Sequence, residues 1–252
     1  LIFRTIPKKI ISAGSILGFF PKVDIRYYSN KKIYELVNKK INKFSTIKKC
    51  ELVSSININL LKDNNETSNN LILLIDKDLI YLNEKKKYHI NISKDQLKNH
   101  YKNNIFILKK IANYYSKDVA VSIHPSYDHY RIQKEYGDIK VYRGQVRELI
   151  KKSYIVLFYD SSAIVDAILF KKKIINLRSD FFEFHNFKTD YYNEDLNLIK
   201  IATNPSQFDM NLIIDYVNKE VNYENYINKY ISHDLEKNGI DTIIKSLEKN
   251  FL

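Results

Sequence analysis

The middle of the chain alternates between continuous apolar runs and segments with apolar residues at helical spacing. Continuous apolar runs bounded by polar residues predict buried strands, and they cover residues 70–76, 119–124, 139–142, 154–159 and 173–177. The helical spacing predicts helices over 93–116, 146–152 and 162–170, with Ser93 as an N-cap. Strands that alternate with helices form βαβ units. We therefore expect an α/β fold, a Rossmann-like parallel sheet with helices on both faces.

The two ends of the chain follow other patterns. The tail from Pro205 onward predicts helices near 205–219, 222–232 and 239–250. At the other end, the pattern indicates short strands at 10–15 and 50–58 and a Lys-rich helical stretch over 31–49. The polar loop at 62–70 is the expected domain boundary. This divides the chain into residues 1–62, the end of something that lies upstream, and residues 63–252.

Composition narrows the class of protein. Apolar residues make up 44% of the chain, which is typical of a packed globular protein. The single cysteine, Cys50, excludes an internal disulfide framework and suits a reducing compartment. No apolar run approaches the roughly 20 residues of a membrane-spanning helix, and no signal peptide is visible.

The formal net charge is +12 and comes mostly from lysines spread along the whole chain. There is no Arg-rich helix, zinc ligand set or aromatic RNA-binding signature in the sequence, so we expect no nucleic-acid partner. A basic surface still favours anionic lipid headgroups or phosphorylated substrates.

One predicted strand ends in His124-Pro125-Ser126. Ligands of open α/β sheets bind outside the carboxyl ends of the strands. The proline keeps the backbone of His124 extended and holds the imidazole at the strand terminus. Two interpretations stay open: a donor to a phosphate or carboxylate, with Ser126 adding a hydroxyl, or a histidine that is hydrogen-bonded within a turn.

A second predicted strand ends in Asp160-Ser161-Ser162, directly before a predicted helix. Hydroxyls and free N–H groups at a helix start favour an anion, although serines there also serve as plain N-caps. The sequence lacks Gly-x-Ser-x-Gly, so this turn is not a nucleophile elbow. Asp166, one turn further on, faces either the pocket or solvent.

The loop Tyr142-Arg143-Gly144-Gln145 closes a third strand. Gly144 permits a tight turn whose exposed backbone would receive a base or ribose. Arg143 either pairs with a phosphate or is a surface residue. The carboxylates of Asp76 and Asp78 have no His or Cys nearby in the sequence, and we expect no metal site.

In this order the motifs resemble the C-terminal, donor-binding half of GT-B glycosyltransferases that build bacterial surface polysaccharides. The His-Pro and Ser-Ser pair is similar to the motifs by which bacterial sialyltransferases hold CMP-sialic acid. The Asp-Ser-Ser-x-x-x-Asp run, residues 160–166, also resembles the CDP-glycerol glycerophosphotransferases of teichoic acid synthesis. The resemblance covers about residues 70 to 180 and rests on short motifs.

The resemblance implies that His124, Ser161 and Ser162 contact the donor phosphate and that Asp166 holds the ribose. It implies a metal-independent enzyme with no cofactor beyond the nucleotide-sugar co-substrate. It also implies that residues 1–62 are the end or remnant of an N-terminal Rossmann-like domain. Two features depart from the family. The acidic motif that carries the general base of sialyltransferases is missing from this sequence, so the catalytic residue is unknown, and Lys171-Lys172-Lys173 replaces the usual Lys-Pro.

The function expected from the resemblance is transfer of a sugar from a nucleotide-activated donor, a CMP-linked sugar such as sialic acid being favoured. The acceptor would be a bacterial surface glycan, such as capsule or lipooligosaccharide, or a lipid-linked precursor. The expected location is the cytoplasm, with peripheral contact at the inner membrane left open. Two alternatives remain: a CDP-glycerol-type glycerophosphotransferase and a non-catalytic nucleotide-binding remnant.

Overall fold

The computed structural model describes residues 23–28, 35, 39, 47–52, 68–77, 92–179, 189–190, 195–231 and 239–251. The chain divides into two compact units, residues 1–62 together with 224–252, and residues 63–223. The residues from 224 onward group with the first unit, and the expected domain assignment of residues 1–62 and 63–252 stays a prediction. The predicted strand at 10–15, most of the stretch at 31–49, and Asp78 lie outside the described residues.

The first unit contains a pair of parallel strands, β1 (Val23–Tyr28) and β2 (Ile47–Leu52). Strand β2 overlaps the predicted strand at 50–58 only in part. The C-terminal elements of this unit are α10 (Glu224–Tyr226), the π-helix η4 (Ile227–Ile231) and α11 (Gly239–Phe251).

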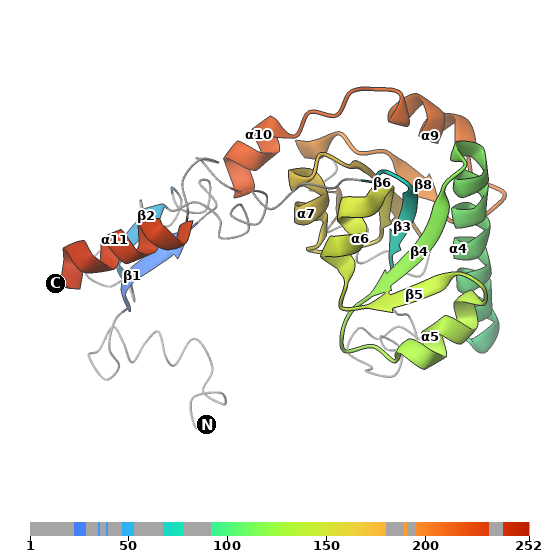
Figure 1. Ribbon diagram of the computed structural model, residues 1–252, viewed down its shortest axis with the longest axis horizontal. Helices are drawn as coiled ribbons and strands as arrows, with labels where there is room; N and C mark the ends of the chain where they lie inside the picture. The colour runs from blue at the N-terminus through green and yellow to red at the C-terminus, as the bar shows by residue number, and fades with distance from the viewer. Residues whose placement is uncertain are drawn as a thin grey trace. The chain divides into compact units, whose positions relative to one another are not determined.

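The second unit is built on a six-stranded sheet in the order β5-β4-β3-β6-β7-β8, and every neighbouring pair is parallel (Figure 1). The predicted α/β, Rossmann-like fold is thereby confirmed. The chain first runs outward from β3 to β5 and then returns to β6 beside β3. The strand order therefore reverses between β3 and β6, which is the point where such sheets bind ligands. The strands are β3 (Leu71–Ile75), β4 (Asp118–Ile123), β5 (Lys140–Arg143), β6 (Ser153–Phe158), β7 (Lys173–Arg178) and β8 (Lys200–Ala202).

The central strands read as continuous apolar runs because both faces of the sheet are covered. Their inner positions are completely buried, as in Leu74, Val121, Leu157 and Ile175. All-parallel sheets require helices on both faces, and such strands lack the alternation of a half-exposed sheet.

Helices α4 (Lys94–Tyr115) and α5 (His129–Tyr136) pack against each other on one side of the sheet. Helices α6 (Val146–Lys152) and α7 (Ile164–Leu169) pack together on the other side, because right-handed crossovers in opposite directions place helices on opposite faces. The predicted N-cap of α4 is confirmed: the Ser93 hydroxyl accepts the N–H of Gln96, and the Gln96 side chain accepts the N–H of Ser93.

Several elements differ from the sequence prediction. Helix α5 was not expected, since only Ile132 and Tyr136 in it are buried, one helical turn apart. Strand β8 was not expected either, because it has three residues. The predicted helix at 205–219 is shorter, α9 (Met210–Val217), because the Asn204 side chain accepts hydrogen bonds from the N–H and hydroxyl of Ser206 and forms a turn instead.

Candidate functional site

The motifs singled out in the sequence lie at one edge of the sheet, where the parallel strands end. His124 follows β4, Gly144 follows β5, and Ser161 lies three residues beyond the end of β6. Strand β3 lies between β4 and β6. With neighbouring strands about 4.8 Å apart, the ends of β4 and β6 are separated by roughly 10 Å, a span that a nucleotide bridges. The motifs from β4 and β6 therefore flank the point where the strand order reverses.

The ring of His124 is exposed, and the loop after β4 fixes its orientation. Its Nδ1 atom accepts the backbone N–H of Ser126 at 3.2 Å and lies 2.7 Å from the Ser126 hydroxyl oxygen. An atom that accepts an N–H carries the lone pair, so in the neutral ring the hydrogen resides on Nε2. The ring of Tyr127 packs beside it at 5.4 Å. The turn thus uses Nδ1, and Nε2–H is the atom of this ring that is able to donate to a ligand.

Gly144 brings the loop after β5 against the His-Pro loop. Its φ of +76° lies in the left-handed region, and a Cβ built there would lie 3.8 Å from Cγ of Pro125. That distance is ordinary van der Waals contact, so the conformation, rather than space, favours glycine. In the same loop Tyr142 is half-buried, while Arg143 and Gln145 are exposed.

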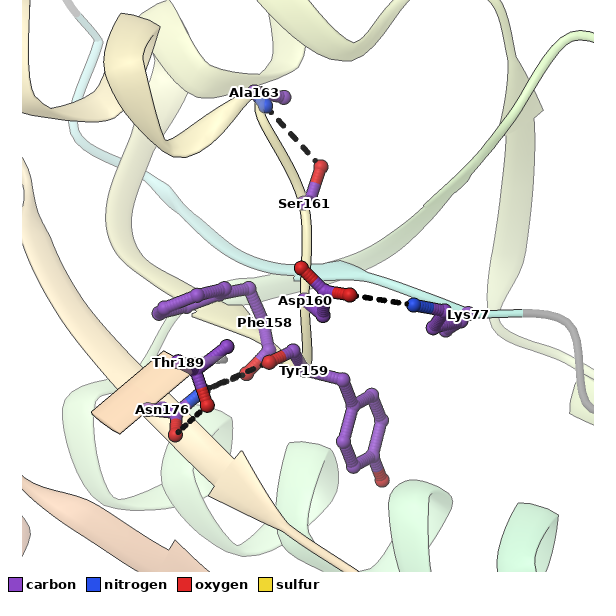
Figure 2. A network of polar contacts seen from close by, with 8 residues as sticks. All are labelled: Lys77, Phe158, Tyr159, Asp160, Ser161, Ala163, Asn176 and Thr189. Atoms are coloured by element: carbon purple, nitrogen blue, oxygen red, sulfur yellow. Dashed lines mark hydrogen bonds and ion pairs between the residues drawn. The ribbon is translucent and has the colours of Figure 1, made fainter. Parts of the chain in front are cut away.

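The two serines form the predicted strand-to-helix turn. The Ser161 hydroxyl accepts the N–H of Ala163 at 3.2 Å (Figure 2). The Ser162 carbonyl accepts the N–H of Val165. Helix α7 consequently begins at Ile164, two residues later than predicted. The Ser161 hydroxyl keeps its own hydrogen for a further bond, and Ser162 is exposed.

The side chain of Asp166 is 18% exposed and is paired with helix α6. Its carboxylate lies 3.6 Å from a guanidinium nitrogen of Arg147. Burial raises the pKa of Asp166, and the positive charge of Arg147 opposes that shift. Arg147 also lies 5.8 Å above the ring of Phe170. The predicted ribose contact of Asp166 would therefore compete with this pairing.

The sequence prediction missed an ion pair at the reversal point itself. Lys77 follows β3, Asp160 follows β6, and Nζ of Lys77 lies 2.7 Å from Oδ2 of Asp160 (Figure 2). The two side chains are 14% and 23% exposed. Lys77 is one lysine among many in this sequence, and the one local signal is its place just after a buried strand.

Beneath this ion pair lies a buried polar network that joins the same strand ends to α4 and α5. The Tyr136 hydroxyl donates to Oδ2 of Asp76 at 2.8 Å and accepts from Nδ2 of Asn104 at 3.0 Å. The Tyr159 hydroxyl donates to Oδ1 of Asn104 at 2.5 Å. Asp76 also accepts the backbone N–H of Lys77 at 2.8 Å. Burial, followed by the charge of Asp76, raises the pKa of both tyrosines, so they remain donors.

His100 completes the network in its neutral form. Its Nε2 atom lies 3.1 Å from Nδ2 of Asn104, which donates to it, and 4.0 Å from Oδ1 of Asp76. Burial lowers the pKa of His100 to about 3. The contact with Asp76 is therefore not an ion pair at neutral pH, since the cost of burying the imidazolium outweighs the attraction of a single carboxylate at that distance.

A third set of contacts fixes the direction in which the chain leaves β6. Nδ2 of Asn176 donates to the carbonyls of Phe158 and Tyr159 at 3.1 and 3.0 Å, and the Thr189 hydroxyl lies 3.4 Å from Oδ1 of Asn176. Figure 2 shows the Tyr159 ring directed away from Ser161, with Asp160 between them. Asn176 of β7 thus holds the backbone at the end of β6, while Asn104 of α4 holds the Tyr159 side chain.

A hollow of about 550 Å³ lies elsewhere, mainly at the amino ends of the strands. Its lining includes Tyr142 and Gln145 but not His124, Ser161 or Ser162. Its charges are of both signs, among them Lys140 and Asp138, which gives no preference for an anion.

Among the described residues, no group of three or more His, Cys, Asp or Glu side chains is placed to hold a metal ion. Within the same part of the chain, every helix is too short or too polar to cross a bilayer.

Comparison with known proteins supports the fold. Neither protein-family models nor curated proteins match the sequence. Among solved structures, the chain is similar to the UDP-GlcNAc 2-epimerase of Methanocaldococcus jannaschii, determined in complex with UDP-GlcNAc and UDP, with a TM-score of 0.51 and 15% identity. The match covers 90% of this chain and 61% of that one, so the chain spans about three fifths of its neighbour's length. The likeness shows a shared GT-B-like fold.

Proposed function

We propose that this protein is a glycosyltransferase that binds a nucleotide-activated sugar at the carboxyl edge of the sheet. The observation that carries the proposal is the placement of His124 and the Ser161-Ser162 turn on the two strands that flank β3, at the point where the strand order reverses. Phosphorylated ligands of α/β sheets bind at such points.

The chemistry follows from the donors at this edge. Transfer of the sugar leaves a nucleotide phosphate that carries additional negative charge. The Nε2–H of His124 and the hydroxyl of Ser161 are oriented by their own loops before any ligand arrives, and such preorganised donors stabilise developing charge without covalent chemistry. The residue that would activate the acceptor hydroxyl is not assigned.

Two observations support the class of nucleotide-sugar donor. The fold neighbour binds UDP-GlcNAc and UDP, which supports a nucleotide-sugar ligand. The His-Pro and Ser-Ser motifs favour a CMP-linked sugar, and the acceptor would then be a bacterial surface glycan such as capsule or lipooligosaccharide. The CDP-glycerol-type phosphotransfer reaction remains the alternative within the same motif set.

A second candidate function is epimerisation of a UDP-linked sugar, which the likeness to a UDP-GlcNAc 2-epimerase favours. The two reactions differ in whether they require an acceptor. An epimerase converts UDP-GlcNAc to an isomeric UDP-sugar by itself, whereas a transferase releases nucleotide in proportion to an added acceptor. Following UDP-GlcNAc by NMR without acceptor tests the second candidate.

The direct test of the first candidate is calorimetric titration of CMP, CDP, UDP and their sugar-linked forms. Wild type should bind one nucleotide class preferentially, and His124→Ala should weaken that binding. Tyr130→Ala is a matched control, because this ring on α5 is 84% exposed. Equal binding of all nucleotides by wild type and His124→Ala would contradict the proposal.

A further inference from the structure

The Lys77–Asp160 pair occupies the point where the strand order reverses, yet neither side chain is needed by the function proposed above. Lys77 lies two residues beyond the end of β3, and Asp160 lies two residues beyond the end of β6. These two strands are hydrogen-bonded neighbours in the sheet. The ammonium of Lys77 therefore stands between the His124 loop on β4 and the Ser161 turn on β6 in the order of the strands.

The residues that precede Lys77 and Asp160 in the sequence, Asp76 and Tyr159, are held in place by buried hydrogen bonds. Asp76 accepts the N–H of Lys77 and the hydroxyl of Tyr136, and Tyr159 is hydrogen-bonded to Asn104. The side chains of Asp76 and Tyr159 therefore contact the helices α5 and α4. Lys77 and Asp160 pair with each other at 2.7 Å, and the buried network fixes the residue that precedes each of them.

We propose that Lys77 binds the phosphate of the nucleotide ligand and that Asp160 is the counter-ion that holds the ammonium in place beforehand. The identity of the ligand as a nucleotide rests on the proposed function, whereas the phosphate contact is specific to this pair. Lys77 and Asp160 are partly exposed, so the pair is accessible to an anion. An ammonium has three donors and is able to contact carboxylate and phosphate together.

A purely structural role of the Lys77–Asp160 pair leads to different expected effects of mutation. If the pair only ties β3 to β6, its removal lowers the melting temperature and leaves anion affinity unchanged. If Lys77 binds phosphate, its neutralisation weakens binding. Loss of the Asp160 charge then strengthens binding, because the arriving phosphate no longer faces a nearby carboxylate.

The test uses pyrophosphate, CMP and UDP with the full chain, in calorimetric titrations accompanied by melting curves. We expect Lys77→Met to weaken phosphate binding by about 10- to 100-fold, as for loss of a charge-assisted hydrogen bond, and Lys77→Arg to retain most of it. Asp160→Asn keeps a hydrogen-bond acceptor and should tighten binding by about 2- to 10-fold, as expected when a partly screened like charge is removed. Lys140→Met is the matched control, since Lys140 is an exposed lysine at the amino end of β5 and should leave binding unchanged.

Every outcome decides between the two roles. If Lys77→Met is too unstable to titrate, the Lys77→Met/Asp160→Asn double variant, which removes both charges of the pair, is compared with Asp160→Asn instead. Unchanged affinity in folded Lys77→Met, or weaker binding in Asp160→Asn, overturns the assignment even if wild type binds nucleotide as proposed. Pyrophosphate binding that depends on Lys77 without any preference for a nucleoside supports the assignment and contradicts the proposed function instead.

Discussion

The ammonium of Lys77 lies 2.7 Å from the carboxylate of Asp160, although 83 residues separate the two along the chain. The pair joins the ends of β3 and β6, where the order of the strands reverses. A β-sheet brings distant residues together because each strand end is fixed by its hydrogen-bonded neighbours. The contact therefore locates the candidate site more closely than any single motif does.

The two serines of the β6 turn should separate in their effects on stability. Ser161→Ala removes the acceptor for the Ala163 N–H and should cost about 1 kcal/mol of unfolding free energy, the usual value of a helix-start hydrogen bond. Ser162 is exposed, and Ser162→Ala should change stability by less than about 0.5 kcal/mol. Urea denaturation measures both. Nucleotide affinity should fall by about 0.5–1.5 kcal/mol in each variant, as for a neutral hydrogen bond. Equal stability of the two variants would show that the Ser161 bond contributes nothing.

Asn104 should be the most sensitive polar position in α4. Its amide contacts His100, Tyr136 and Tyr159, and its replacement leaves buried groups with fewer partners. We expect Asn104→Leu, which has a similar volume, to lower the unfolding free energy by about 2–4 kcal/mol. Asn113→Leu, at an exposed position of the same helix, should change it by less than about 0.5 kcal/mol. A loss below 1 kcal/mol in Asn104→Leu would mean that the network does not stabilise this face of the sheet.

His100 should make stability depend on pH. In the folded protein burial holds its pKa at about 3, whereas the unfolded chain has a value near 6.5. Between these two values the unfolded state binds the extra proton, so unfolding free energy should fall as pH falls, by about 1.4 kcal/mol per pH unit from this residue. The decline begins below about pH 6.5 and ends near pH 3.

His100→Gln isolates this contribution, because the glutamine carbonyl is able to accept the Asn104 hydrogen bond without titrating. Urea denaturation at half-unit steps from pH 7 to pH 4.5 should give a shallower slope for the variant than for wild type. The carboxylate of Asp76, 4.0 Å away, is present in both proteins. Parallel slopes would show that His100 is protonated in the folded state.

The sequence predicted those elements whose signal lies in neighbouring residues. Ser93 and Gln96 form a capping box that is readable from their spacing, and continuous apolar runs marked the central strands because both faces of a parallel sheet are buried. The sequence did not predict α5, because only two side chains of this helix are buried in the core. The placement of His124 and the serines at one edge could be expected from the rule for parallel strands.

The remaining features of the site depend on tertiary packing. The pairing of Asp166 with Arg147 joins two helices, and the network through Asn104 joins two strands to two helices. The sequence around a polar residue in the middle of an amphipathic helix does not indicate which distant residues it contacts. For this reason neither Lys77 nor Asn104 could be selected from the sequence, while the roles of His124, Ser161 and Ser162 toward a ligand stay predictions.

Titration of CMP and UDP into wild-type protein and His124→Ala measures whether the carboxyl edge of the sheet binds a nucleotide. If Nε2–H of His124 donates a charge-assisted bond to the phosphate, the variant should lose about 1.5–3 kcal/mol of binding free energy, roughly 10- to 150-fold in affinity. Its melting temperature should match that of wild type, because the ring is exposed and fills no core volume. Unchanged nucleotide affinity in a folded His124→Ala protein would contradict the assignment and leave the histidine as a turn residue.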